Sequence, residues 1–280
     1  MKKRFFAVCV VVWTVSLFSS RSLMAMPSDA DSNTAQMKGE WVQFPLAVGA
    51  SVDFVDRDLN HNEELNSLSW YGANIYFDPV ERLHFNLFLG AAQGDLDNLR
   101  VELSTGGLVP NVVGLGESDT AFAIGISSKA DVVELNLVPN QPNAQLFVSG
   151  GYRYTNPDLD SAQGSNGLQP TALNLKIGLS EWQAGGGIQQ PLEGIIAGVV
   201  FAPYIGVKYS DVNLDISGTS SFPAGPGVTA SIVTGERKSD DVVGLFLGLQ
   251  ILGWENRLSF DVEGRFIDES AVYINSRMRW

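Results

Sequence analysis

The sequence predicts an all-β protein: a closed antiparallel β-barrel that crosses a membrane, with ten strands as the best count and eight or twelve as the alternatives. Three observations predict it. Segments of about ten residues alternate between apolar and polar side chains, the period of two that an extended strand imposes. The connections between these segments alternate in length. After residue 25 no run reaches the ~18 apolar residues of a membrane-spanning helix.

The N-terminus has the three parts of a secretory signal peptide. Basic residues at 2–4 precede an apolar run over 5–18, and a small-residue cleavage site ends at Ala25. The alternative is a membrane-anchoring helix, but a run of about 14 residues is short for the ~20 that a hydrocarbon core needs. We therefore expect a signal peptide at 1–25, a short polar periplasmic leader at 26–38 and the barrel at 39–280.

Charge and cysteine content narrow the class of protein. The chain has 18 basic and 31 acidic residues, and removal of residues 1–25 would take away four basic residues and no acidic one. A strongly acidic chain repels phosphate backbones, so nucleic acid is excluded as a partner. The single cysteine, Cys9, lies in the signal peptide, so the mature chain would form no disulfide.

The segment from Val42 to Phe54 shows the alternation most clearly. Its even-numbered positions are all apolar, and the positions between them include Gln43, Ser51 and Asp53. A helix would scatter these apolar residues over all its faces. About ten residues at ~3.3 Å each, tilted near 40°, span ~25 Å, the height of the apolar band of a barrel. We assign the apolar face to lipid.

The same alternation predicts nine further strands. The sixth is the least regular, because its apolar phase slips near Glu181 and Trp182, and a β-bulge there would restore the phase. The nine cover about residues 71–77, 83–89, 122–132, 146–154, 173–188, 199–207, 243–251, 258–266 and 271–280.

The connections alternate in a way that gives the barrel two different ends. Those after the second, fourth, sixth and eighth strands are short. Those after the first, third, fifth and seventh are longer and polar, reaching about 25 residues at 93–119 and 211–241. Short periplasmic turns and long outer loops have this rhythm. Apolar and polar residues still alternate inside both long loops, so we expect their hairpins to continue as strands above the membrane.

A secreted β-sandwich is the main alternative fold, because it also alternates and also has glycine-rich turns. A sandwich turns one face of each strand to water, so it needs neither such long strands nor so unbroken an apolar face. Charged side chains are nearly absent from most of the apolar faces. Lys or Arg at the centre of a lipid face costs roughly 2–4 kcal/mol, which accounts for that absence. The sequence favours the barrel.

The last strand ends the chain on an aromatic residue, with apolar side chains at alternating positions before it. This pattern resembles the C-terminal strand of Gram-negative outer-membrane β-barrels. The resemblance implies a location in the cell outer membrane, among small OmpA-like or opacity-type barrels. It also implies lipids, lipopolysaccharide and the barrel-assembly machinery as partners. The assembly signal would consist of Ile274, Met278 and Trp280.

Polar side chains on the other face of the strands would line the lumen. About eight strands leave an interior that side chains just fill, and ten leave slightly more. A tight connection between the last two strands would place Asp261 opposite Arg277 or Arg279. It would place Glu263 opposite Asn275 or Arg277, so that acids meet bases. The predicted lumen network of ion pairs and polar groups consists of Arg82, His84, Arg153, Lys208, Asp261, Glu263, Arg265, Arg277 and Arg279.

Catalysis finds little support in the residues. The chain has two histidines: we expect His84 to be a hydrogen-bonding lumen residue and His61 a solvated loop residue. Outer-membrane proteases of the omptin type have ten strands and use an Asp-His pair with an Asp-Asp pair at the barrel rim. Asp240 and Asp241 lie near a rim here without a histidine beside them in the sequence. The sequence therefore predicts that the protein is not an enzyme.

One acidic stretch after the first strand has the spacing of a calcium loop, with oxygen ligands at every second position. His61 replaces the glycine that the sharp turn needs, and Ser67 stands where a bidentate Glu would be. A solvated loop tip explains the charge better, so we predict no metal site and no cofactor, although such a loop could recruit divalent ions that bridge to lipopolysaccharide. The weak calcium candidates are Asp56, Asp58, Asn60 and Asn62.

Two functions remain. Either polar and ionic side chains plug the lumen and the protein has a structural or surface-recognition role, with an extracellular ligand at its acidic loops, or the lumen is a narrow porin-like channel for small solutes. An outer-membrane hydrolase is a distant third. The predicted ion pairs in the lumen favour the first.

Overall fold

The computed structural model of the chain is a single antiparallel β-barrel. It describes residues 46–59, 63–80, 82–101, 112–158, 163–164, 172–221, 235–239, 242–254 and 257–279. The strands are β1 (Leu46–Leu59), β2 (Glu63–Val80), β3 (Leu83–Val101), β4 (Val112–Glu117), β5 (Ala121–Leu135), β6 (Ala144–Thr155), β7 (Gln163–Gly164), β8 (Ala172–Gln189), β9 (Leu192–Ile196), β10 (Val199–Ser221), β11 (Gly235–Lys238), β12 (Val243–Gly253), β13 (Leu258–Phe266) and β14 (Ser270–Arg279).

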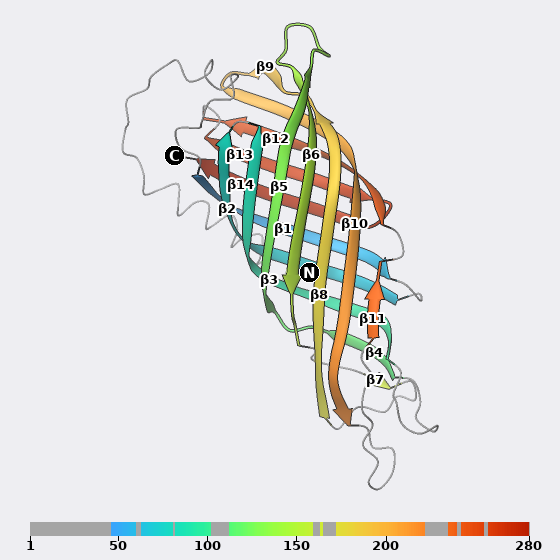
Figure 1. The fold of residues 1–280 in the computed structure, drawn as a ribbon. Coiled ribbons are helices and arrows are strands. Elements are labelled where there is room, and N and C mark those ends of the chain that lie inside the picture. Colours follow the sequence, from blue (N-terminus) through green and yellow to red (C-terminus); the bar gives the residue numbers. More distant parts are fainter. Residues whose placement is uncertain are drawn as a thin grey trace.

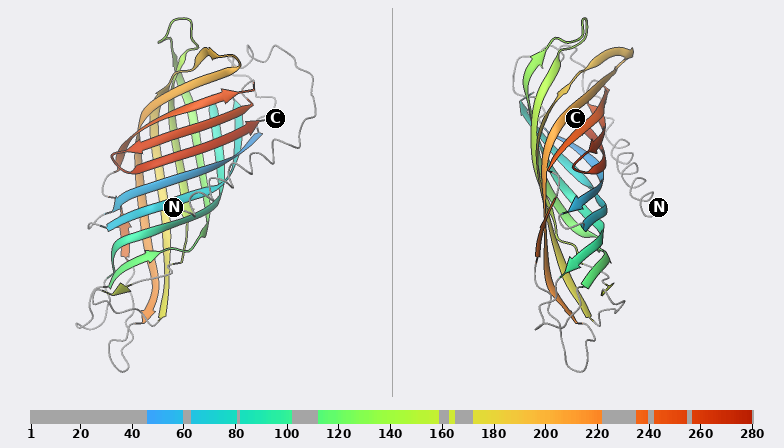
Figure 2. Two further views of the ribbon diagram at one scale, coloured as in Figure 1. Left: turned by 180° about the vertical axis from the view of Figure 1, so that it is seen from behind. Right: turned by 90° about the vertical axis from the view of Figure 1, so that its right-hand side faces the viewer.

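The barrel closes where its first strand pairs with its last. β1 and β14 are antiparallel neighbours from Ala47↔Arg279 to Asp56↔Ser270, and the tilted strands wrap around one lumen (Figures 1 and 2). The ten strands of the described residues that form the wall follow one another as β1, β2, β3, β5, β6, β8, β10, β12, β13 and β14. All ten predicted strands are therefore present, and the predicted count is confirmed.

The two ends of the barrel differ. One end holds the beginning of β1, the end of β14 and the connections β2–β3, β5–β6, β8–β10 and β12–β13; we call it the turn end. At the opposite loop end, β3 extends beyond both of its wall partners, and β8 and β10 extend together beyond β6 and β12. There β3 pairs with β4 and β10 pairs with β11. Both long connections therefore continue as paired strands, as predicted.

The outside of the barrel is an apolar belt. Its exposed large side chains lie at alternate positions of nearly every wall strand, as in Phe122, Ile124 and Ile126 of β5 or Val243, Leu245 and Leu247 of β12. Such a belt suits contact with hydrocarbon, because exposing this much continuous apolar surface to water would be costly. Among the described residues, no helix has the length and apolar character needed to span a membrane.

Glycines on the lumen side let aromatic rings lie flat against the wall. A Cβ added at Gly206 would come 2.4 Å from Phe246, and one at Gly248 would come 2.3 Å from Tyr204. Both distances are below any real contact, so these positions tolerate no side chain. Because the rings lie along the wall, the centre of the lumen is left open in the half of the barrel that faces the turn end.

In the half toward the loop end, apolar side chains fill the lumen. We call this set the apolar cluster; twelve buried residues form it, with Phe88 packed against it. Its members come from strands on all sides, so they meet across the lumen. The buried residues are Val55, Leu59, Leu65, Leu68, Trp70, Ala92, Ala123, Ile177, Leu179, Val212, Leu214 and Ala271.

The apolar cluster explains why the predicted bulge in the sixth strand was wrong. β8 pairs with both β6 and β10 without any register shift. The apolar residues of β8 change from one face to the other in the sequence because Ile177 and Leu179 are apolar and face the lumen, where they are 2% and 3% exposed. The outward face continues regularly through Trp182, which is 63% exposed.

A second expectation, a long polar loop after the first strand, was also wrong. β1 ends at Leu59 and β2 begins at Glu63, so three residues separate the two strands. Residues that were expected to be loop continue the antiparallel ladder, with Leu59 opposite Glu63. Val42, Phe44, the predicted signal peptide and the predicted leader lie outside the described residues, so their assignments stay predictions.

Candidate functional site

The centre of the lumen is crossed by a ring of six charged side chains that alternate in sign; we call it the charged ring. Three of its contacts are Asp53 Oδ2 to Arg153 Nη1 at 2.5 Å, Arg57 Nη2 to Glu181 Oε1 at 3.4 Å, and Arg265 Nη1 to Glu269 Oε1 at 2.9 Å. The other three join Arg153 to Glu181, Arg57 to Glu269, and Arg265 to Asp53. Together these contacts form a closed circuit through Asp53, Arg153, Glu181, Arg57, Glu269 and Arg265.

Two further charges and a hydroxyl complete the layer. Lys208 of β10 pairs with Glu269 and lies 3.1 Å from Asp268 Oδ2. The Arg57 guanidinium also donates to Ser210 Oγ at 2.6 Å. Four cations thus face four anions, so the layer is electrically balanced. Its members come from β1, β6, β8, β10, β13 and the β13–β14 turn, and they meet only because the sheet is closed.

The charged ring is dry at its core. The side chains of Arg57, Asp268 and Glu269 are 0% exposed, and that of Glu181 is 3% exposed. In the β13–β14 turn, burial raises the pKa of Asp268. Burial also acts to raise the pKa of Glu269, but the charges of Arg265, Arg57 and Lys208 outweigh it and hold that pKa at about 2. Removing one partner of such a pair leaves an uncompensated buried charge, which costs about 3–5 kcal/mol.

The charged ring and the apolar cluster are stacked along the lumen. On β8, Leu179 of the cluster lies on the loop-end side of Glu181, and on β10, Val212 lies on the loop-end side of Lys208. On β1 the two sets interlock, with Val55 between Asp53 and Arg57. Arg153 joins the two layers, because its guanidinium lies 4.6 Å from the centre of the Trp70 ring. A cation over an aromatic face is stabilised further when both are shielded from water.

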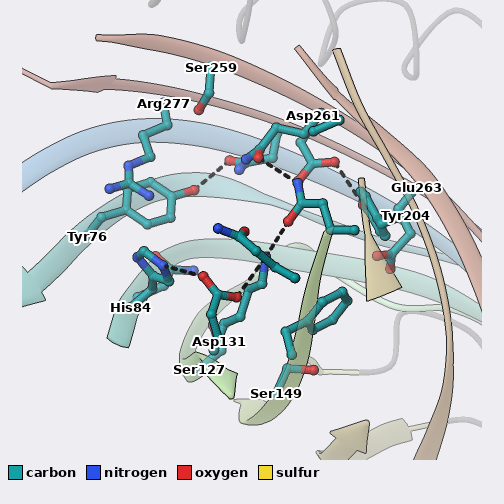
Figure 3. Close-up of a pocket in the computed structure, with 18 of the residues that line it drawn as sticks. Tyr76, His84, Ser127, Asp131, Ser149, Tyr204, Ser259, Asp261, Glu263 and Arg277 are labelled. Atoms are coloured by element: carbon teal, nitrogen blue, oxygen red, sulfur yellow. Dashed lines mark hydrogen bonds and ion pairs between the residues drawn. The ribbon is translucent and has the colours of Figure 1, made fainter. Parts of the chain in front are cut away.

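On the turn-end side of the charged ring lies a cavity of about 1170 Å³. It exists because the inward positions of β5, β6 and β8 carry small residues, among them Gly125, Ser149 and Gly185. Figure 3 shows side chains from opposite walls projecting into this space. Its rim includes Arg82 and Glu134, whose side chains are exposed and lie 2.6 Å apart. The cavity therefore opens at the turn end and stops at the charged ring.

A second group of charges lies near the mouth of this cavity. Asp78, buried at the end of β2, pairs with both Arg277 and Arg279 of β14. His84 lies between two carboxylates, with Nδ1 2.9 Å from Asp78 and Nε2 3.6 Å from Asp131. This turn-end cluster ties β2, β3, β5 and β14 together.

The predicted pairing of the closing hairpin was wrong. Asp261 lies opposite Asn275 and Glu263 lies opposite Tyr273, two residues from the expected register. The reason is the β13–β14 turn: β13 ends at Phe266 and the carboxylates of the turn fold into the lumen. A shift of two keeps every side chain on its expected face but changes its partner. Arg277 therefore pairs with Asp78 instead of an acid of β13.

The predicted lumen residues fall into separate groups. Arg153, Lys208 and Arg265 belong to the layer of the charged ring, while His84, Arg277 and Arg279 belong to the turn-end cluster. Arg82 is at the exposed rim. Asp261 and Glu263 line the cavity between the two groups. Of the assembly candidates, Ile274 and Met278 pair with Val52 and Val48 on the β1–β14 seam, and Trp280 lies outside the described residues.

Sequence reasoning missed six charged residues of these groups: Arg57, Asp78, Asp131, Glu181, Asp268 and Glu269. Arg57 and Glu181 could have been found by following the inward positions of their strands farther toward the loop end. Asp78, Asp268 and Glu269 stand in or beside turns, where acidic residues are ordinarily solvated. No signal in the sequence marks them as buried, because their cations come from strands far away along the chain.

The weak calcium candidates are not gathered into a site by the described residues. Asp56 and Asp58 are exposed and share the outward face of β1, and Asn60 and Asn62 lie outside the described residues. Within the described ranges no three His, Cys, Asp or Glu side chains come together in a way that could hold a metal ion.

Comparison with known proteins finds no matching family model. The major outer membrane porin of Chlamydia trachomatis serovar A is 27% identical over 184 residues, which are 55% of this chain and 44% of the porin. The serovar H porin is 26% identical over 185 residues, 55% of this chain and 45% of the porin. The chain therefore matches less than half the length of these curated relatives.

Two solved structures are similar at low identity. The outer membrane protease OmpT from Escherichia coli has a TM-score of 0.44 at 10% identity, over 86% of this chain and 99% of that chain. The outer membrane protein OprG from Pseudomonas aeruginosa has a TM-score of 0.37 at 12% identity, over 86% and 98%.

The outer surface of the barrel indicates where in the cell the protein is located. The ten wall strands of the described residues form a closed sheet in which β1 pairs with β14, and the outer face of this sheet is apolar. These are the requirements for β-structure in a bilayer, and the sequence relatives are outer-membrane proteins. The chain is an outer-membrane β-barrel.

Proposed function

We propose that this protein is an outer-membrane barrel with a closed lumen and a structural or surface-recognition role. One observation carries the proposal: two blocking layers, the charged ring and the apolar cluster, lie one above the other across the lumen. Either layer alone would hinder an ion, and an ion would have to pass both.

The two layers oppose conduction for different physical reasons. To pass the charged ring, an ion must separate buried pairs such as Arg57–Glu269, and separation leaves charges without partners. To pass the apolar cluster, it must shed its hydration water among side chains such as Leu59 and Leu214, both 0% exposed. We therefore expect a barrel that is silent at rest.

The proposed function includes no catalytic role. His84 is the only histidine in the part of the chain that the structure describes, and both of its ring nitrogens face carboxylates. It therefore has no nitrogen directed at a nucleophile. Its position between Asp78 and Asp131 fits a group that ties strands together at the turn end.

Surface partners belong to the same proposal. Outer-membrane lipids would contact the apolar belt, and lipopolysaccharide and an extracellular ligand would meet the loop end, where β3 and β10 extend past the wall. The barrel-assembly machinery would recognise the last strand through Ile274, Met278 and Trp280.

A narrow channel for small solutes is the second candidate. Two observations favour it: the sequence similarity to a porin of Chlamydia trachomatis, and the cavity of about 1170 Å³ that already occupies the turn-end half of the lumen. A channel would need both the charged ring and the apolar cluster to rearrange.

Single-channel recording separates the two candidates. The chain without residues 1–25, refolded and inserted into a planar bilayer, should give no steady conductance steps in 1 M KCl. A reproducible single step size in the unmodified protein would reject the closed-lumen proposal in favour of the channel. Heat-modifiable migration on unboiled gels checks that the tested protein is a folded barrel, because a closed barrel resists detergent.

A further inference from the structure

Two carboxylates of one strand stand together in the middle of the cavity on the turn-end side of the charged ring. Asp261 and Glu263 of β13 both line it, and Figure 3 shows them beside Tyr204. Within the described residues, Asp261 has no cation at ion-pair distance. Glu263 has one, Arg265 Nε at 3.6 Å, and Arg265 is already paired with Asp53 and Glu269.

The cations on either side of these two carboxylates are directed mainly at other acids. The four cations and four anions around the charged ring balance one another. At the mouth, Lys129 lies 3.8 Å from Asp131 and Arg82 lies 2.6 Å from Glu134. Arg277 and Arg279 are drawn away from β13 toward Asp78. Asp261 therefore has no ion-pair partner among the described residues, and Glu263 shares its one cation, Arg265, with two other carboxylates.

Aromatic faces stand next to these carboxylates. The Tyr204 hydroxyl donates to Asp261 Oδ1 at 2.8 Å. Tyr204, Phe147 and Phe246 contact one another, with ring centres 6.1 to 6.3 Å apart. Gly248 lies between Tyr204 and Glu263 across three neighbouring strands, so no side chain separates that ring from that carboxylate.

The protein already places an ammonium group against this aromatic wall. Lys129 Nζ lies 4.4 Å from the centre of the Phe147 ring and donates to Gln189 Oε1 at 2.7 Å. In this arrangement Lys129 forms its ion pair with Asp131, not with Asp261 or Glu263. It demonstrates that the wall accepts a positive nitrogen over an aromatic face.

We propose that this cavity binds a small organic cation, an ammonium compound held by the carboxylates of Asp261 and Glu263 and seated against Tyr204, Phe147 and Phe246. An ammonium group with an apolar substituent satisfies both features of the site, since carboxylates attract its charge and aromatic faces attract its methyl or methylene groups. The ligand enters at the turn end, which in an outer-membrane barrel faces the periplasm. The binding does not depend on whether the barrel conducts.

A matched pair of ligands tests the charge requirement on the unmodified protein. Choline and 3,3-dimethyl-1-butanol have nearly the same shape, but the second has carbon in place of the positive nitrogen. Calorimetric titration of the refolded chain, in a non-ionic detergent, should show choline binding at least about tenfold more tightly than the neutral compound. Equal affinities for the two compounds, or no binding of choline, would overturn the proposal.

Variants then locate the site. The double variant Asp261→Asn with Glu263→Gln should lose the preference for choline and bind both compounds alike. Glu134→Gln is the matched control, because it removes a carboxylate at the exposed rim and should leave choline affinity within about twofold. Undiminished choline binding by the double variant would place the cation elsewhere and reject the assignment. Each variant is checked for heat-modifiable migration.

Two neighbouring carboxylates could bind a metal ion instead of an organic cation. Titration with Ca²⁺ tests this alternative directly. Because choline is expected to contact the aromatic wall, Phe246→Leu should weaken choline binding about tenfold or more. If Ca²⁺ instead competes for the site with higher affinity than choline, and Phe246→Leu has no effect on choline, the site is a carboxylate site for metal and the organic-cation proposal falls.

Discussion

Arg57 and Glu269 are 212 residues apart in the sequence and form an ion pair in which both side chains are completely buried. The pair joins the first wall strand to the turn before the last one. It therefore spans the seam at which β1 meets β14 and closes the barrel. The charged ring can form only when the barrel is closed, and its ion pairs in turn stabilise the closed barrel.

Replacing either partner of this pair should destabilise the barrel. Arg57→Ala or Glu269→Ala each leaves the buried charges of this layer unbalanced by one, so we expect a loss of about 3–5 kcal/mol in the free energy of unfolding. The double variant should recover part of the sum, because both charges are then gone. Urea unfolding followed by tryptophan fluorescence measures all three. Arg82→Ala removes an exposed pair and should cost under about 1 kcal/mol.

Strict additivity of the Arg57 and Glu269 variants would mean that the two charges do not interact in solution. Losses of only a few tenths of a kcal/mol would mean that the ring is hydrated, which would favour the channel over the closed barrel.

The glycines under the aromatic rings should be intolerant of any side chain. In Gly206→Ala the new Cβ would meet the Gly186 carbonyl oxygen at 2.3 Å and Phe246 at 2.4 Å. Backbone and ring must both move, so we expect a loss of about 1–3 kcal/mol or more in the free energy of unfolding. Gly253→Ala is the control, since nothing lies within 4 Å of its new Cβ. Equal stability of the two variants would contradict the packing described for β10 and β12.

Conductance should appear only when both layers of the lumen are opened. Arg153→Ala with Glu181→Ala removes two adjacent members of the charged ring. The apolar cluster still blocks the path, so we expect rare or no current steps. Adding Leu214→Ser and Leu59→Ser makes the second layer polar and should produce frequent steps in a planar bilayer. Frequent steps in the ring variant alone would show that the apolar cluster is no barrier.

The terminal residue should matter for assembly more than its neighbour. Trp280→Asp should lower the amount of folded barrel in the outer membrane, because a charge replaces the aromatic residue that ends the lipid face. Arg279→Ala removes one of two arginines on Asp78 and should have the smaller effect. Heat-modifiable barrel in outer-membrane fractions is the readout, and equal amounts of the two variants would remove the special role of Trp280.

The sequence by itself determined the strands and their two faces. Alternation places Val48 and Phe54 outward and Ser51 and Asp53 inward, because a strand can turn its side chains only to one side or the other. Lipid then requires an unbroken apolar face, so the pattern is strong even in a single sequence. The ten wall strands and the outer-membrane location followed from it.

Only the closed tertiary structure decided which charges meet. A register shift of two in the β13–β14 hairpin leaves the alternation unchanged, so the sequence could not exclude Arg277 opposite Asp261 or select Asn275. Glu181 and Glu269 reach Arg57 from other strands and turns across the lumen. Such contacts depend on how far the sheet curves before it closes, and local sequence pattern contains no information about that distance. The charged ring, the apolar cluster and the cavity between the walls are therefore properties of the closed barrel.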